Sequence, residues 1–287
     1  MSEQHLQIIH DYVDKMPSLS TTVTKVLEVC DQPNVSANDL NKIISLDPIL
    51  TGNVLKLINS AYYALPNQIT SLTRAIIVLG LNTVKNLALS TAVLGTMKES
   101  NQSSFSMDDF WMHSICVGVA AKAIAVELKV PANQREEYFL AGLLHDLGKI
   151  PMAHCFSDEY DCCLASAYEQ QIPLYEAETA IFSSNHQHFG SIIAGKWKLG
   201  DSIVETMKYH HQPEKSDQAH RLLISSVAIA DLYANIFSIG SAGNHFESEE
   251  QIALLFEQNP LSWETLVSLH ETIQEAIEKA SIFLKLA

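Results

Sequence analysis

The chain has 287 residues, 47% of them hydrophobic and 18% charged, and its formal net charge is −15. This length and hydrophobic share suffice for one large or two modest hydrophobic cores without disulfide staples. Because only 18 Lys and Arg residues are spread along an acidic chain, direct binding to a nucleic-acid backbone is not expected.

The first hundred residues are predicted to form helices that begin at polar capping residues. Ser36 and Asp39 form a capping box, and Asp47 followed by Pro48 supplies an N-cap and a first-turn proline for the next helix. Ser71 caps a third helix, and a fourth follows a glycine break. We expect these helices at about 36–46, 48–61, 71–78 and 82–97.

The Ser/Asn/Gln-rich stretch between about 98 and 108 predicts a polar linker. We place a boundary there, with an N-terminal helical subdomain at 1–103 and a core with the C-terminal helices at 104–287. The second part is expected to contain helices at about 108–129, 133–147, 157–171, 174–184, 187–198, 201–211, 217–239 and 262–286. Since no convincing stretch alternates apolar and polar residues between turns, the fold class is predicted to be all-α.

Cysteine usage and the chain ends indicate a cytoplasmic protein. The five cysteines are odd in number and include no CxxC pair, which is typical of reduced thiols rather than a disulfide framework. The first residues lack the basic and apolar regions of a signal peptide, and no uninterrupted apolar run approaches the ~18 residues of a membrane span. We therefore expect neither export nor a membrane partner.

The pair His145 and Asp146, within the apolar run 143–151, is the most informative feature of the chain. An ionised carboxylate buried there without a partner costs several kcal/mol or more. The following Gly148 indicates that the pair lies at a helix C-terminus, where the helix dipole also disfavours negative charge. A nearby cation would resolve both problems.

Other predicted helices supply the donors that such a cation needs. In chain order, together with the pair, they form the series His113, His145, Asp146, His186, His210, His211 and Asp231. Because each donor or pair comes from a different predicted helix, a shared site requires those helices to converge. His188 offers the same chemistry as His186, and the sequence does not decide between them. This nitrogen and oxygen set suits one or two divalent ions, Fe, Mn or Zn.

Several of these residues also have ordinary structural explanations. His113 lies on an apolar helical face, where a lone histidine is more often a satisfied core residue. His210 and His211 stand just before a proline, and histidines are favourable in the last turn of a helix. Asp231 is harder to explain in this way, because Asn235 is its only polar neighbour at helical spacing.

The ordered series resembles the ligand series of the HD metal-hydrolase superfamily. The N-terminal part also resembles the signature of HDOD domains, in the motifs Asp47-Pro48, Asn59-Ser60-Ala61, Arg74-Ala75-Ile76 and Leu79-Gly80. The similarity extends over about residues 16–213. It implies a mostly helical fold in which an N-terminal helical bundle packs against an HD-like core.

HDOD domains are regarded as regulatory or scaffolding modules of bacterial signalling proteins, and many have lost the HD ligands. This chain departs from that tendency because it retains a complete-looking set. It also departs from the related HD-GYP cyclic di-GMP phosphodiesterases, since no glycine occurs between His211 and Gly240. Hydrolysis of cyclic di-GMP is therefore not expected.

The resemblance leaves three functions open, of which we favour the first. In this first function the protein is a cytoplasmic signalling module that relays a state to a protein partner, with the metal as a structural pin or a sensor. Because 287 residues leave no room for a fused receiver or output domain, that partner is expected to act in trans. In the third function the protein is a metal-free interaction scaffold.

In the second function the protein is a metal-dependent phosphohydrolase that acts on a phosphate ester or nucleotide. Asp146 would bridge two metals, one completed by His113, His145 and Asp231 and the other held by His186 and His210. A metal-activated water would attack phosphorus, and Lys149 would help to balance charge on the oxygens. Lys149 has an equally ordinary explanation as a solvated lysine at a helix end.

Overall fold

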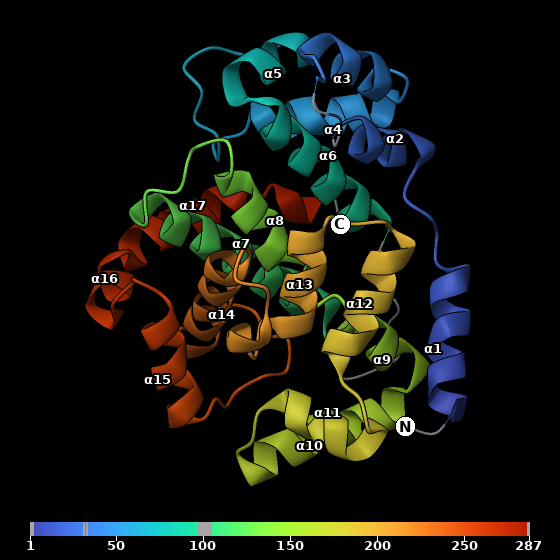
Figure 1. The fold of residues 1–287 in the computed structure, drawn as a ribbon, viewed down its shortest axis with the longest axis vertical. Coiled ribbons are helices and arrows are strands. Elements are labelled where there is room, and N and C mark those ends of the chain that lie inside the picture. Colours follow the sequence, from blue (N-terminus) through green and yellow to red (C-terminus); the bar gives the residue numbers. More distant parts are fainter. Residues whose placement is uncertain (1–2, 31, 33, 97–104, 286–287) are drawn as a thin grey trace.

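The computed structural model describes residues 3–30, 32, 34–96 and 105–285, which form helices and no strand (Figure 1). The all-α prediction is therefore confirmed for the described chain. In order, the helices are α1 (Glu3–Lys15), α2 (Thr21–Cys30), α3 (Ala37–Ile44), α4 (Pro48–Ile58), α5 (Leu72–Leu79), α6 (Leu81–Thr96), α7 (Met107–Glu127), α8 (Arg135–Leu144), α9 (Lys149–Cys155), α10 (Ser157–Gln170), α11 (Leu174–Phe182), α12 (His186–Lys196), α13 (Asp201–Tyr209), α14 (Arg221–Ile236), α15 (Glu249–Gln258), α16 (Trp263–Ser268) and α17 (His270–Ala280), with short 3-10 turns at Pro213–Lys215 and Phe283–Lys285.

The capping residues of the N-terminal bundle act as predicted. The Ser36 hydroxyl accepts a hydrogen bond from the Asp39 amide, and the Asp39 carboxylate accepts one from the Ser36 amide. Asp47 and Ser71 likewise accept hydrogen bonds from amides in the first turns of α4 and α5. These local bonds define where α3, α4 and α5 begin.

Three predictions in the C-terminal half are wrong in detail. Residues 149–155 and 249–258 form α9 and α15, for which we predicted no helix. The single helix expected at 262–286 is divided into α16 and α17 at Leu269. His270 stands at this break, where its ring packs on Phe237 at 4.2 Å and its Nδ1 is hydrogen-bonded to the Tyr233 hydroxyl at 2.9 Å. These contacts of His270 with a distant part of the chain lie at the break between the two helices, and no local sequence pattern reveals them.

The N-terminal bundle, α2 to α6, packs on the core chiefly through α6 and α8 (Figure 1). By contrast, α1 packs against α9 and α12 of the core, so the first helix lies beside residues far from it in the sequence. The predicted boundary at 103/104 and most of the predicted linker lie outside the described residues. The division at that point stays a prediction.

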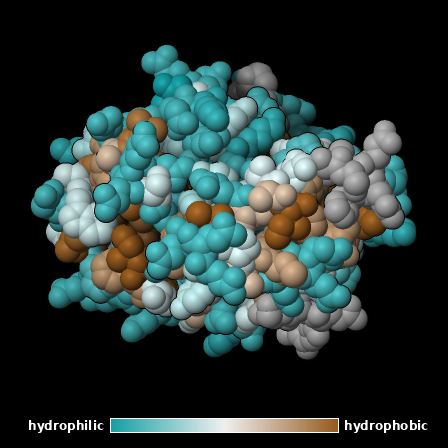
Figure 2. Space-filling view, turned by 90° about the horizontal axis from the view of Figure 1, so that it is seen from below, coloured by the Kyte–Doolittle hydropathy of each residue, from teal (hydrophilic) through white to brown (hydrophobic). Residues whose placement is uncertain are grey.

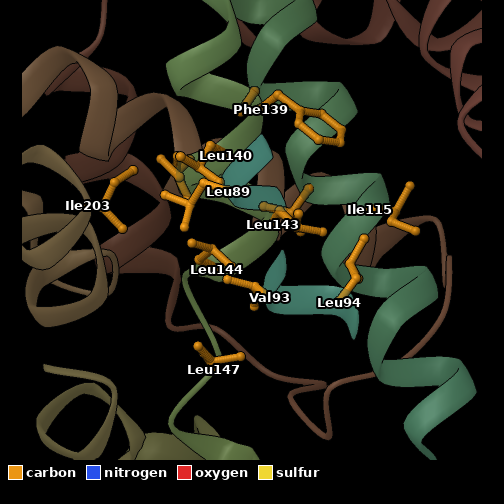
Figure 3. Close-up of a cluster of buried hydrophobic side chains, with 14 of the residues drawn as sticks. Leu89, Val93, Leu94, Ile115, Phe139, Leu140, Leu143, Leu144, Leu147 and Ile203 are labelled. Carbon is orange, nitrogen blue, oxygen red and sulfur yellow. The ribbon is translucent and has the colours of Figure 1, made fainter. Parts of the chain in front are cut away.

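The centre of the molecule is the close contact between α7 and α8. A Cβ at Gly118 would lie 2.7 Å from the Phe139 carbonyl oxygen, and one at Gly142 would lie 2.8 Å from the Gly118 Cα. Both positions therefore require glycine, and they bring the two backbones together near the two helices' predicted ligands. Around this contact, α6, α8 and α13 contribute apolar side chains (Figure 3), among them Leu89, Val93, Leu94, Leu140, Leu143, Leu144 and Ile203.

Helix α7 is the one single helix in the described chain that is long and apolar enough to cross a membrane. However, 72% of its most apolar window is buried within the protein, as is typical of the core helix of a soluble protein. The bent pair α5 and α6, which turns by 119°, passes the same test only as a combined segment. The face in Figure 2 is mainly hydrophilic, with small separate hydrophobic patches.

Candidate metal centre

The seven predicted ligands converge at one buried place. His113 lies in α7, the His145-Asp146 pair directly follows α8, His186 opens α12, His210 and His211 directly follow α13, and Asp231 lies in α14. Their donor atoms form two groups in which all atoms lie within 4.8 Å of one another. The first group is Asp146, His186, His210 and His211, and the second is His113, His145 and Asp231.

The His145-Asp146 pair does follow the end of a helix, but the predicted reason is wrong. Gly148 is not a left-handed cap, since its φ is −66°, and residues 145–148 form tight turns that lead directly into α9. Glycine is required because a Cβ at this position would overlap the His186 carbonyl oxygen and lie 2.5 Å from the Gly190 amide nitrogen. Gly148 thus allows this turn to approach α12 and brings Asp146 beside His186.

The exposure of each side chain distinguishes the residues of the two groups from His188, the other histidine considered as a ligand. His145 and His186 are fully buried. Of the other residues in the two groups, His211 is half-buried and the rest are buried, with Asp231 the most exposed of these at 5%. His188 is exposed and lies outside both groups, so the structure places His186 at this centre. His113 faces the Asp231 carboxylate, with 3.0 Å between its Nε2 and Oδ1 of Asp231, and its Nδ1 has no hydrogen-bond partner.

Three imidazoles are oriented by hydrogen bonds on the side away from the centre. Nδ1 of His145 lies 2.7 Å from the Gly142 carbonyl oxygen, and Nδ1 of His210 lies 3.0 Å from the Thr206 carbonyl oxygen. Carbonyl oxygens only accept, so Nδ1 carries the proton in both rings. Nδ1 of His186 is similarly bonded to a carboxylate. In the neutral rings, each Nε2 therefore presents a lone pair to the centre.

These lone pairs face one another and a carboxylate. Nε2 of His186 lies 3.2 Å from Nε2 of His210, 3.2 Å from Nε2 of His211 and 3.2 Å from Oδ1 of Asp146. Nε2 of His145 lies 3.2 Å from Oδ2 of Asp146. Nε2 of His145 and Oδ1 of Asp146 are among the buried atoms without a hydrogen-bond partner. Imidazole nitrogens and carboxylate oxygens brought this close together are placed to share a divalent cation, so the residues fit a metal.

Three ionisation states at this centre suit metal binding. Burial by itself would raise the pKa of Asp146, but His145 and Lys149 lower it well below its ordinary value. Burial would also raise the pKa of Asp231, but His113 outweighs this effect and lowers the pKa to about 2. Burial lowers the pKa of His210 to about 4. At His145, by contrast, burial lowers the pKa but the neighbouring Asp146 carboxylate more than offsets this and raises it. Ionised carboxylates and a neutral imidazole are the forms that bind metal ions.

Lys149 is not a solvated helix-end lysine. Its side chain is 1% exposed, and its Nζ lies 2.6 Å from Oδ2 of Asp146. Burial lowers the pKa of Lys149, but the Asp146 carboxylate more than offsets this and the pKa is raised. The ammonium therefore stays charged and balances the carboxylate; a catalytic role for Asp146 and Lys149 stays a prediction.

Two residues at the centre were missed in the sequence. Glu178 is fully buried, and its Oε2 accepts hydrogen bonds from Nδ1 and the backbone amide of His186 at 2.7 and 2.9 Å. It is a buried acid in an apolar helix, the same signal that identified Asp231. Glu247 forms a third group of possible ligand atoms with His211 and Asp231. It lies in an irregular polar segment, where no periodicity could reveal it.

Residues 16–213 match the family described as HDOD domain. The chain is also 25% identical over 224 residues to an uncharacterized protein of Treponema pallidum (strain Nichols). That alignment covers 78% of this chain and 43% of the relative, so the chain spans less than half of the relative's length.

Solved structures show the same fold over nearly all of the chain. The structure of an HDOD domain protein with unknown function from Geobacter sulfurreducens has a TM-score of 0.76 and 22% identity, with 99% of each chain covered. A "Putative phosphohydrolase" from Shewanella amazonensis SB2B gives 0.72 and 20%, with 97% of each chain covered. A "Putative signal transduction protein" from Marinobacter aquaeolei VT8 gives 0.70 and 20%, covering 98% of this chain and 64% of the other.

Proposed function

The chain belongs to the HDOD domain family, and on that premise we propose that it is a bacterial cytoplasmic signalling protein with a retained metal centre. One or two divalent ions, Fe, Mn or Zn, would bind between the two groups of donors. The observation that carries the proposal is the convergence of nitrogen and oxygen donor atoms from five separate parts of the core, among which Nε2 of His145 and Oδ1 of Asp146 are buried without a hydrogen-bond partner.

The ligand side chains would couple helices that are far apart in the sequence. His113 would be tied to Asp231 of α14, and Asp146 to the first turn of α12 and the end of α13. A bound ion supplies the positive charge that makes these contacts attractive. Filling or emptying the centre would therefore change how firmly α7, α12, α13 and α14 hold together, which is the state a protein partner in trans would recognise.

A second set of contacts supports a relay between the N-terminal bundle and the metal centre. The Tyr63 hydroxyl, just after α4, donates to Oε1 of Glu136 at 2.7 Å, and Lys122 donates to Oε2 at 2.6 Å. Lys122 lies in α7, which also carries His113. Glu136 lies in α8, which ends directly before His145. The bundle thus also contacts the two central helices through a partly buried polar cluster around Glu136.

Metal analysis of the protein purified without a histidine tag tests the proposal. We expect one or two transition-metal ions per chain, lost in Asp146→Ala and retained in the matched control His188→Ala, since His188 is exposed and outside the donor groups. Metal-free protein after growth with several metals would contradict the proposal and favour the metal-free scaffold.

A metal-dependent phosphohydrolase is the second candidate, favoured by the buried Lys149 beside Asp146. Against it, the described cavity that His211 lines measures about 70 Å³, whereas pockets for drug-sized ligands measure about 300–1,000 Å³. Turnover of a phosphate ester or nucleotide at about 1 per second or faster, abolished by Asp146→Ala but not by His188→Ala, would favour the enzyme. No turnover of cyclic di-GMP is expected.

A further inference from the structure

The irregular segment between α14 and α15, residues 237–248, is docked against the turn of α7 that carries His113. Gly240 has a φ of +65°, and a Cβ there would overlap the His113 amide nitrogen and lie 2.5 Å from the Asp109 carbonyl oxygen. The Ser241 amide donates to that same carbonyl oxygen at 3.0 Å. The backbone at 240–241 therefore lies directly against the turn of α7 that carries His113.

Asn244 anchors the same segment on its other side. Its side chain is buried, and its Oδ1 accepts a hydrogen bond from the Leu174 amide, the first of α11, at 3.0 Å. Its Nδ2 donates to Oε1 of Glu247 at 2.5 Å. One amide side chain thus satisfies a free helix-end amide and orients the Glu247 carboxylate.

The Glu247 carboxylate is directed at the metal centre. One of its oxygens, a ring nitrogen of His211 and a carboxylate oxygen of Asp231 all lie within 4.8 Å of one another. Two carboxylates at this separation repel each other, and half-buried Glu247 accepts a hydrogen bond from the Asn244 amide. An imidazole with two carboxylates is a donor set that suits Mn, Fe or Zn.

We propose that Glu247, His211 and Asp231 form a further divalent-cation position at this centre, so that residues 237–248 are a metal-held cover over it. This inference rests on the proposed function, because His211 and Asp231 also belong to the two main donor groups. When the position is filled, the cover is tied to α13 and α14 in addition to its contacts with α7 and α11. The centre is then closed on that side to a bulky phosphate ester.

Titration of the metal-free 287-residue chain with Mn²⁺ tests the inference. Bound ions per chain and their affinities are compared for wild type, Glu247→Gln and the matched control Glu250→Gln, whose residue is exposed on α15. We expect wild type and Glu250→Gln to agree. Glu247→Gln should lose one ion per chain, or bind its weakest ion at least 10-fold less tightly, and keep the others.

Chymotrypsin cleavage after Phe246 gives a second readout, which can also be measured in wild type alone. Mn²⁺ should slow this cleavage in wild type and in Glu250→Gln but not in Glu247→Gln. If Glu247→Gln does not fold, cleavage of wild type with and without Mn²⁺ decides, because unchanged cleavage overturns the inference.

The two proposals fail in different ways. Unchanged ion number and affinities in Glu247→Gln overturn the inference while the main metal centre stands. A wild type that binds no divalent ion overturns both.

Discussion

Gly148→Ala tests whether the approach of the His145-Asp146 turn to α12 determines the metal centre. The new Cβ would overlap the His186 carbonyl oxygen and lie 2.5 Å from the Gly190 amide nitrogen, where ordinary contacts measure 3.4–4 Å. Both obstacles are backbone atoms, so no side-chain rotation relieves the overlap. The turn and the first residues of α12 must therefore separate.

The required separation is about 1 Å or more, and overpacking of this kind costs typically 1–3 kcal/mol. We expect Gly148→Ala to lower the free energy of unfolding by ~3 kcal/mol, because rigid backbone yields less than side chains. For a chain of this length that corresponds to a melting temperature lower by about 5 °C. Since His186 moves relative to Asp146, metal affinity should also fall at least ~10-fold.

Gly195→Ala is the matched control. Gly195 lies in α12, is exposed, and a Cβ there would have nothing within 4 Å. Alanine should be neutral or stabilise the helix by up to ~1 kcal/mol. Thermal melting with and without metal, together with chelator competition, measures both variants. If Gly148→Ala melts and binds metal like Gly195→Ala, the close approach does not determine the centre and the reasoning is refuted.

Four further results are expected. Glu178→Gln should weaken metal binding by ~10–100-fold in chelator competition, because the carboxylate orients His186; equal affinity would show that the orientation does not matter. Removing bound metal should lower the melting temperature of wild type but not of Asp146→Ala. An ion present at 1,000 times its Kd stabilises the folded state by about 4 kcal/mol. Identical melting curves with and without metal would contradict the coupling between metal binding and folding. Glu136→Gln should cost ~2–4 kcal/mol in thermal melting, less than a fully buried pair because Lys122 is 23% exposed, and adding Lys122→Met should recover most of the loss. Burial lowers the pKa of Lys122, but Tyr62 and Glu136 raise it above 10.5, so this stabilisation is complete below pH 10.5 and is lost as the pH rises through the folded-state pKa. The wild-type melting temperature should therefore fall more steeply above pH 10.5 than that of Lys122→Met.

Local chemistry was enough to predict the helical class and the start of several helices. Ser36, Asp47 and Ser71 accept hydrogen bonds from amides three residues away, so their roles are visible within a few residues of sequence. The metal-ligating types were visible for a related reason. A carboxylate such as Asp146 in an apolar stretch must find a charge partner wherever the chain folds.

What the sequence left open depends on contacts between distant elements. His186 and His188 are two residues apart and chemically equal, yet only the first lies beside Asp146, because α12 meets the turn at Gly148. Glu247 comes from a segment with no periodic pattern. Its place is set by two contacts of its segment. Gly240 packs against α7, more than a hundred residues away in the sequence, and Asn244 is hydrogen-bonded to the first residue of α11, 70 residues away.

The physical reason is that capping and hydrophobic periodicity act over one or two helical turns, whereas the approach of two backbones depends on packing of the whole core. The need for glycine at positions 118, 142 and 148 arises from a neighbouring helix rather than from the local φ and ψ. Residue types therefore determined which atoms could bind a metal. Only the tertiary structure decided which of those atoms meet.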